Sequence, residues 1–303
     1  MENLILVFLL VMAGYSFQRL QAFPAPQAAA ILNQYVIHIS LPALVLWQVP
    51  KLPFSTELLA PLLMPWLLLI ITAGLVLMVA KLLHWSRPLT GGMLMVVPLG
   101  NTSFVGVPLI EALYGGHGVP YAILYDQTGT FLALATYGAV ILAAYHGDGM
   151  PGFKPTVRKI LTFPPFLSLI GALILRFTYN PPFLEFYLQK LAETLVPVVM
   201  VAVGLSFKLR PPPGESLELG IGLLLKLVVT PLVALAICLV MGWQGVAAEV
   251  TVLEAGMPSM ITAGALAMAA GFAPQVMAAM VGWGIVLAFG TLLMIKQLLF
   301  LLG

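Results

Sequence analysis

The sequence has 303 residues, of which 61% are hydrophobic and only 8% are charged, and its formal net charge at pH 7 is +2. Soluble domains carry about 25% charged residues, so this composition excludes a soluble globular protein and predicts an integral membrane protein in a lipid bilayer. The few basic residues lie between apolar runs and form no patch, so no nucleic-acid partner is expected.

Long apolar segments follow one another along the whole chain. A membrane-spanning helix needs about 20 apolar residues, and this criterion predicts about ten spans. They cover residues 3–19, 28–49, 57–83, 88–113, 118–146, 159–177, 183–208, 215–241, 246–270 and 274–301.

Lysine and arginine residues predict the orientation of these spans. One set of alternating connections carries Arg19, Lys81, Arg87, Lys154, Arg158, Lys159, Lys208 and Arg210, and the other carries only Lys51, Arg176 and Lys296. Because cytoplasmic connections carry the excess of basic residues, the first set is expected in the cytoplasm and both termini outside.

The longest polar connector divides the chain near its centre. Residues 1–146 and 159–303 would each hold five spans, and residues 147–158 would form a cytoplasmic linker. Since five is odd, the second half enters the membrane with the opposite orientation, as in an inverted repeat. Prolines recur in spans two and seven and before spans five and ten, which supports a relation between the halves. The sequence therefore predicts an all-α membrane fold of ten helices in a 5+5 inverted repeat.

Two of the apolar segments are interrupted by glycine, proline and polar residues, at positions 98–108 and 254–262. A bilayer offers no water to freed backbone groups, so an interrupted helix survives only where protein or a wet cavity replaces those bonds. Paired interruptions in corresponding halves of a membrane chain indicate a transporter's binding site.

Each interruption would start a new half-helix inside the membrane, with exposed N–H groups at its positive end. Such an end favours an anion such as a carboxylate, so we expect the neighbouring side chains to bind an anionic substrate. The alternative is that these side chains only cap the new helix starts. The candidates are Asn101, Thr102, Ser103 and Pro108 in the first break, and Pro258, Ser259 and Thr262 in the second.

An aspartate lies inside the fifth predicted span. An Asp at the centre of a membrane helix costs about 2.5–3.5 kcal/mol to insert, so Asp126 needs a partner or a cavity. Thr130 follows one turn later and adds an oxygen on the same helix face. We expect both to bind a coupling cation or proton beside the first break; the alternative is that the carboxylate caps freed N–H groups there.

A glutamate immediately precedes the second break. The half-helix that ends there leaves carbonyl oxygens unpaired, and these oxygens attract cations. Glu254 would complete a sodium site or carry a proton; the alternative is an ion pair with Lys226 in the preceding span. Hard oxygen donors suit sodium, and no other cofactor is expected. The sodium ligands would be Asn101, Thr102, Asp126, Thr130 and Glu254.

The stretch Gly-Asn-Thr-Ser-Phe-Val-Gly-Val-Pro at 100–108, followed by Tyr-Asp-Gln at 125–127, resembles the auxin efflux carrier family. That family includes the plant PIN-FORMED carriers and bacterial permeases for malate, malonate and similar anions. The resemblance covers essentially the whole chain. It implies the fold of the sodium–bile-acid symporters, in which spans four and nine cross at their breaks.

The resemblance also implies a domain division and a setting. Spans one, two, six and seven would form one domain, and spans three, four, five, eight, nine and ten would form a core domain. Gln127 would lie at the coupling site, and a homodimer is expected. The long cytoplasmic loop of many plant carriers is missing, so the resemblance implies a prokaryotic permease in the inner cell membrane.

The second break departs from the family pattern. The family tends to show consecutive prolines followed by an asparagine, whereas here only Pro258 is present and Thr262 stands near the asparagine position. Instead, the segment from Glu254 to Met257 resembles the Glu-x-Gly-x segment of the bile-acid symporters, whose glutamate helps to bind sodium.

These patterns favour a secondary transporter of a small organic anion that works by alternating access and is coupled to sodium or protons. A carrier closer to the bile-acid symporters is the alternative. No phosphate-binding loop appears, so ATP is not expected to drive transport. The motifs of zinc proteases, serine hydrolases and prenyl-diphosphate enzymes do not occur, so an enzyme is not expected. A membrane receptor that binds the same ligand without moving it is a further alternative.

Overall fold

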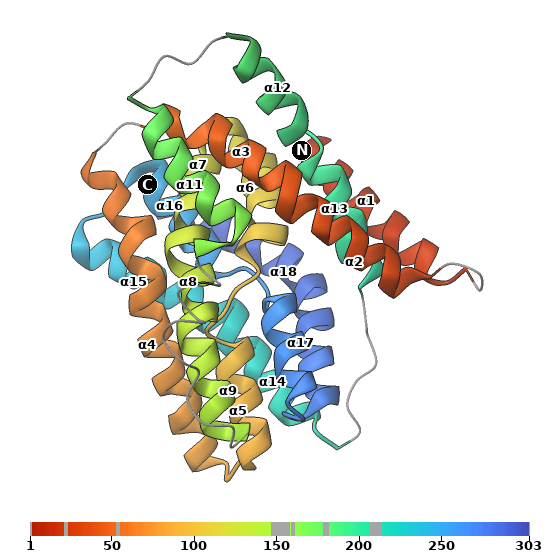
Figure 1. Cartoon of the computed structure of the whole chain (residues 1–303). Helices are drawn as coiled ribbons and strands as arrows, with labels where there is room; N and C mark the ends of the chain where they lie inside the picture. The colour runs from red at the N-terminus through yellow and green to blue at the C-terminus, as the bar shows by residue number, and fades with distance from the viewer. Residues whose placement is uncertain are drawn as a thin grey trace. The chain divides into compact units, whose positions relative to one another are not determined.

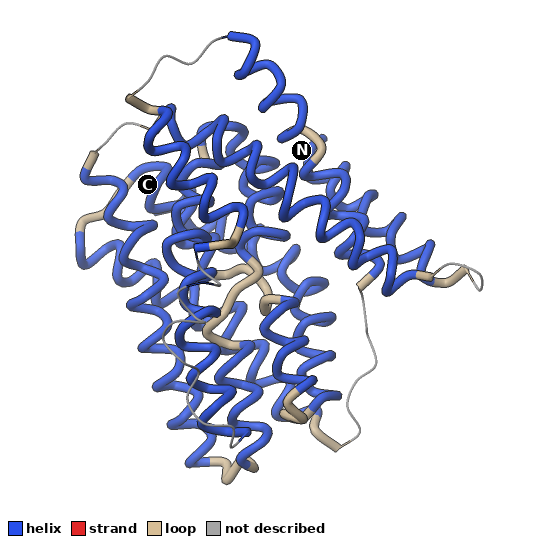
Figure 2. Tube along the Cα trace, viewed as in Figure 1, coloured by secondary structure: helices blue, strands red, loops and turns tan. Residues whose placement is uncertain are grey.

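A computed structural model describes residues 2–20, 24–52, 55–146, 158, 161–177, 182–206 and 214–302. Within these ranges the chain is helical with short connections, and the single backbone bridge, between Gly100 and Ser259, belongs to no strand (Figure 2). The predicted all-α class is therefore confirmed. Some of the sequence predictions fall outside the described residues. They concern most of the linker 147–158, including Lys154, and the basic residues Lys159, Lys208 and Arg210.

Six described helical stretches are long and apolar enough to cross a membrane. They are Ala25–Lys51, Thr56–Leu82, Val119–Tyr145, Phe183–Leu205, Ser216–Met241 and Pro274–Leu302, and each lies within a few residues of a predicted span. Two shorter apolar helices, Ile5–Gln18 and Pro164–Leu175, fall at the first and sixth predicted spans. The segments predicted as spans four and nine each contain short helices separated by a break. The count of ten, the 5+5 repeat and the crossing of spans four and nine stay predictions.

The chain forms two compact units, and the first comprises Met1–Ser55, Ser103–Ile123 and Val157–Phe207. Within it α13 packs along α1 and α2, and α3 packs against α11 and α12 (Figure 1). Its elements are α1 (Glu2–Gln18), α2 (Ala25–Tyr35), η1 (Val36–Ser40), α3 (Leu41–Gln48), η2 (Val49–Lys51), α6 (Val107–Tyr114), η5 (Gly115–His117), most of α7 (Val119–Leu124), α11 (Pro164–Leu175), α12 (Pro182–Ala192) and α13 (Leu195–Leu205).

The second unit comprises Thr56–Thr102, Leu124–Thr156 and Lys208–Gly303. Within it α4 packs against η6 and α16, and α17 packs between α5 and α18. Its elements are η3 (Thr56–Leu58), α4 (Leu59–Leu82), α5 (Arg87–Val96), η6 (Tyr125–Thr130), α8 (Phe131–Ala133), η7 (Leu134–Gly138), α9 (Ala139–His146), α14 (Ser216–Leu224), η8 (Leu225–Val229), α15 (Thr230–Met241), α16 (Gly245–Ala255), α17 (Ile261–Ala269) and α18 (Pro274–Leu302). The division into units cuts the π-helical turn η4 (Thr102–Gly106). Its first residue, Thr102, is the last residue of a segment of the second unit, and its other residues are assigned to the first unit. The predicted domain boundaries remain a prediction.

Two glycines allow α1 and α13 to approach each other closely inside the first unit. A Cβ atom added to Gly14 would lie 2.2 Å from the carbonyl oxygen of Val201, and one added to Gly204 would lie 2.1 Å from that of Val11. Real Cβ atoms do not come so near to backbone, so both positions require glycine. Small residues at a helix contact are the usual means by which membrane helices pack backbone to backbone.

Gly204→Ala is therefore expected to force α1 and α13 apart. Overpacking of a tight contact costs roughly 1–3 kcal/mol, so the thermal midpoint of the detergent-purified protein should fall by several degrees. Gly220→Ala is the matched control, because a Cβ at this position in α14 meets no atom within 4 Å. Equal midpoints for Gly204→Ala and wild type would show that the two helices are not packed this closely.

Candidate functional site

The two interrupted segments are hydrogen-bonded to each other within the second unit. The N–H of Asn101 donates to the carbonyl oxygen of Pro258 at 2.7 Å, and the N–H of Met260 donates to that of Leu99 at 2.9 Å. These bonds flank the bridge between the two breaks. Each break therefore satisfies backbone groups that the other one frees, which is what a membrane interior requires.

The carboxylate of Asp126 is fixed at the start of the first break. Thr102 Oγ1 donates to Asp126 Oδ1 at 2.5 Å, and Gln127 Nε2 donates to Asp126 Oδ2 at 2.6 Å. The side chain is buried, with 1% of its surface exposed. The bond from Thr102 thus joins the π-helical turn η6 to the residues that pair with the second break.

Helix α4 supports η6 from the other side. Trp66 Nε1 donates to the carbonyl oxygen of Thr128 at 3.0 Å, and a Cβ added to Gly129 would lie 2.3 Å from the ring of Pro65. Because Gly129 has no side chain, the proline ring packs directly against the backbone of the turn that carries Asp126.

The second buried acid, Glu254, lies at the end of α16. It is 1% exposed, and neither of its carboxylate oxygens has a hydrogen-bond partner among the described residues. It interacts electrostatically with Asp126 and Lys226. The expected cation-attracting carbonyls are also here, but Lys226 Nζ already donates to one of them, the oxygen of Ala255, at 3.1 Å. Among the described residues, Lys226 and Glu254 form no direct ion pair. Lys226 is bonded to the backbone of Ala255 in place of the ion pair that was the alternative in the sequence analysis.

A cavity of about 10 Å³ lies between these groups. A site of this size holds about one water molecule, so by volume it has room for at most one small ion and excludes an organic anion. Its polar lining consists of Thr102, Tyr125, Thr130, Lys226, Thr230 and Glu254, and its remaining lining consists of Pro65, Leu68, Leu69, Pro98, Leu99, Gly100 and Ala133.

The structure therefore gathers only part of the predicted site. Thr102, Thr130, Lys226 and Glu254 line one cavity, whereas Asp126, which is bonded to Thr102 and Gln127, does not line it, and neither does Gln127. Sequence reasoning missed two lining residues. Tyr125 directly precedes Asp126, and Thr230 lies four residues after Lys226, so both were one helical turn or less from a residue already singled out.

The other predicted site residues, which are substrate ligands except for Met257 at the coupling-ion or proton site, differ in exposure and in unit. Pro258, Ser259 and Met257 are buried in the second unit, and Thr262 is exposed in the first turn of α17. Ser103 and Pro108 belong to the first unit, where Ser103 is half-buried and Pro108 is buried near the start of α6.

The capping alternative does not describe the start of α17. The N-cap position is Met260, and no side chain caps this helix. The hydroxyl of Ser259, which is fully buried, has no hydrogen-bond partner among the described residues. The first turn of α17 therefore keeps backbone N–H groups that a ligand could bind.

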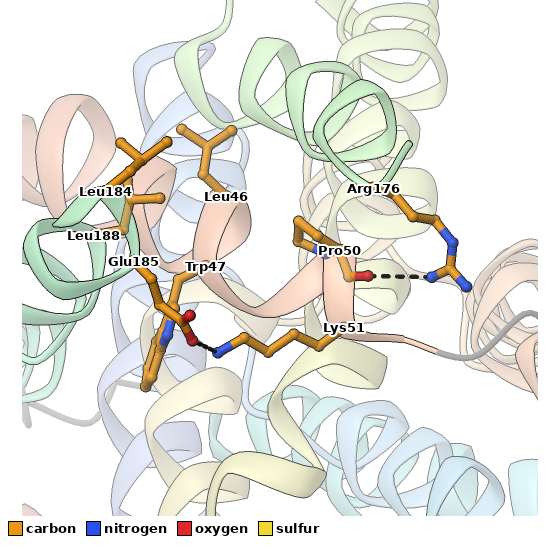
Figure 3. A pocket seen from close by; sticks show the side chains of 8 residues that line it. All are labelled: Leu46, Trp47, Pro50, Lys51, Arg176, Leu184, Glu185 and Leu188. Atoms are coloured by element: carbon orange, nitrogen blue, oxygen red, sulfur yellow. Dashed lines mark hydrogen bonds and ion pairs between the residues drawn. The ribbon is translucent and has the colours of Figure 1, made fainter. Parts of the chain in front are cut away.

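The first unit has a separate cavity of about 230 Å³ (Figure 3). Its charged groups are already engaged with protein: Lys51 Nζ lies 2.6 Å from Glu185 Oε1 and 4.7 Å from the centre of the Trp47 ring. Arg176 donates to the carbonyl oxygens of Pro50 and Leu52. Leu46, Leu184 and Leu188 complete the lining. These bonds connect the end of α3 to α11 and α12. The charged residues around this cavity therefore stabilise the packing of the three helices.

Removal of the Thr102 hydroxyl should weaken the contact between η6 and the first break. In Thr102→Val the shape is kept but Asp126 loses a buried hydrogen bond, which costs about 1–3 kcal/mol. The thermal midpoint of the purified protein should fall accordingly, and Thr102→Ser, which keeps the hydroxyl, should stay close to wild type. Equal midpoints for the Val and Ser variants would contradict the role of this bond.

Gly129→Ala should be among the most destabilising alanine substitutions in the second unit, since its Cβ would overlap the ring of Pro65. A loss of about 1–3 kcal/mol is expected from overpacking. Gly74→Ala, on the same helix α4 as Pro65 and with no atom within 4 Å of the new Cβ, is the control. Urea or thermal unfolding would measure both variants, and equal stability would show that η6 does not rest on Pro65.

The sequence matches known proteins along nearly its whole length. The profile of the family described as membrane transport protein covers residues 1–150 and 153–295. An uncharacterized transporter of Methanocaldococcus jannaschii is 28% identical over 275 residues, which cover 86% of this chain and 85% of that protein. An uncharacterized transporter of Methanothermobacter thermautotrophicus is 28% identical over 272 residues, or 88% of this chain and 87% of that protein. The resemblance noted in the sequence is confirmed, and the chain belongs to the membrane transport protein family, which includes the auxin efflux carriers.

Proposed function

We propose that this chain is a secondary active transporter that moves a small organic anion across the cell membrane by alternating access, with coupling to a sodium ion or a proton. Its transporter family supports a transport role. The observation that carries the proposal is the backbone pairing of two interrupted membrane segments beside two buried acids, Asp126 and Glu254. Interrupted helices with this arrangement are the usual construction of substrate and ion sites in secondary transporters.

The coupling cation or proton is assigned to the buried acids. The cavity beside Glu254 has room for one small ion or one water, and Thr102 and Thr130 also line it. Buried carboxylates in a membrane are costly, and they persist where a cation or a proton neutralises them during the working cycle. Asp126 accepts hydrogen bonds from Thr102 and Gln127. Binding of a cation or proton in this region would therefore act on the first break through Asp126 and its bond to Thr102.

The organic anion is assigned to the start of α17. The cavity beside Glu254 is too small for it. The first turn of α17 offers uncapped N–H groups and the exposed hydroxyl of Thr262. Positive helix ends and hydroxyl donors both suit a carboxylate. In this proposal a core domain rocks or slides against the other domain, both termini lie outside, and the carrier works as a homodimer.

Asp126→Asn and Glu254→Gln are each expected to reduce ion-coupled uptake into proteoliposomes strongly. Loss of a charged, buried partner is worth about 1.5–3 kcal/mol, which corresponds to a fall of about tenfold or more in uptake. Labelled dicarboxylates, bile-acid-like anions and indole-type anions would be offered under an imposed sodium or proton gradient.

Glu249→Gln is the matched control for these variants, because it removes the same charge from α16 but at a half-buried position. The control should transport as wild type does, and all variants should keep the wild-type elution profile. Normal transport by both acid variants would overturn the assignment of the acids. Ligand binding without accumulation in sealed vesicles would instead identify a receptor.

A further inference from the structure

Lys226 lies where an interrupted helix would bind a cation. It is in the π-helical turn η8 and only 2% of its surface is exposed. Its Nζ donates to the carbonyl oxygen of Ala255, the last residue of α16, at 3.1 Å. The C-terminal end of a helix carries a partial negative charge, so the ammonium group and this end attract each other.

The surroundings of this ammonium group are those of a small-cation site. Thr102, Thr130, Thr230 and Glu254 line the same cavity, and hydroxyl and carboxylate oxygens are the donors that hard cations bind. The titratable groups that line this cavity with Lys226 are Glu254 and Tyr125, and Asp126 interacts electrostatically with Glu254. Gly100 leaves the necessary room, since a Cβ on it would lie 3.2 Å from Nζ.

The site does not fit sodium while Lys226 is present. About 10 Å³ of space remains, which suffices for one water but would put a sodium ion beside the ammonium group. Two like charges at such a distance repel strongly in a buried site. We infer that Lys226 is a built-in cation that takes the place of a coupling sodium ion at the end of α16. This inference deepens the proposed function and rests on it, and it predicts that coupling in the native chain is independent of sodium.

The test measures cation binding through thermal stability, without transport. The full chain is purified in detergent, and its midpoint is compared in sodium chloride and choline chloride at equal ionic strength. A cation that binds only the folded protein raises the midpoint in proportion to its occupancy. The wild type is expected to show equal midpoints in the two salts.

Lys226→Ala should convert the position into an open cation site. Its midpoint in choline chloride should fall by several degrees and should recover partly and saturably with sodium chloride. Propylammonium, which has the size of the missing part of the side chain, should also restore stability, whereas propanol should not, which separates replacement of the charge from filling of a hole. Lys81→Met, which removes an exposed lysine at the end of α4, should show no sodium effect.

Several outcomes would overturn the inference. One is a saturable sodium stabilisation of the wild type that disappears in Glu254→Gln, because sodium would then bind with Lys226 in place. Another is a Lys226→Ala variant that responds equally to propanol and propylammonium. If Lys226→Ala does not fold, Lys226→Gln is compared in sodium chloride and choline chloride alone, because its side chain leaves no room for propylammonium; a saturable sodium stabilisation is again expected, and its absence would overturn the inference.

The result is distinguishable from a failure of the proposed function. If no anion is transported by the wild type, the carrier assignment fails, while the stability comparison still decides the role of Lys226. If an anion is transported, replacement of sodium by choline on both sides of the membrane should leave its uptake unchanged. Uptake that requires sodium would overturn the inference and leave the carrier assignment intact.

Discussion

Two backbone hydrogen bonds, from Asn101 to Pro258 and from Met260 to Leu99, are the contacts on which the centre of the second unit depends. A helix that is interrupted inside a bilayer frees N–H and carbonyl groups that no water can satisfy, and each such group costs several kcal/mol. One interrupted segment alone would be unstable. Two of them placed side by side satisfy part of each other's backbone, so each break is tolerated only in the presence of the other.

Some polar side chains around these bonds have hydrogen-bond partners and others do not. This difference distinguishes groups that stabilise the structure from groups that are available for ion or proton binding. Asp126 accepts from Thr102 and Gln127, and Lys226 donates to Ala255. Glu254 has no such donor among the described residues, although it is equally buried. Buried polar groups normally find partners, so an exception calls for a reason such as an ion or a proton that the protein takes up. Glu254 is therefore the group in this region whose state a working cycle would change.

Apolar length and Gly/Pro interruptions were sufficient to predict the helical class, six long spans and both breaks, because these features are local. The expected position of Asp126 beside the first break is also found, since Thr102 donates to its carboxylate. The partner of Lys226 could not be predicted, because the sequence does not give the rotation of η8 relative to α16. Glu254 was therefore as plausible a partner as the carbonyl oxygen of Ala255. The contact of Gly129 with Pro65 was missed for the same reason, since it joins segments 64 residues apart.

The same bonds give the proposed carrier a physical route between its two ligands. The start of α17, assigned to the anion, is bonded through Met260 to Leu99. Three residues further on, Thr102 lines the small cavity and holds Asp126. A ligand shifts an equilibrium only if it interacts differently with the two states. An anion that displaces the start of α17 would therefore strain the pairing at Leu99 and alter the position of Thr102. The cation or proton at the acids would then bind with a different affinity, and by reciprocity its binding would change the affinity for the anion.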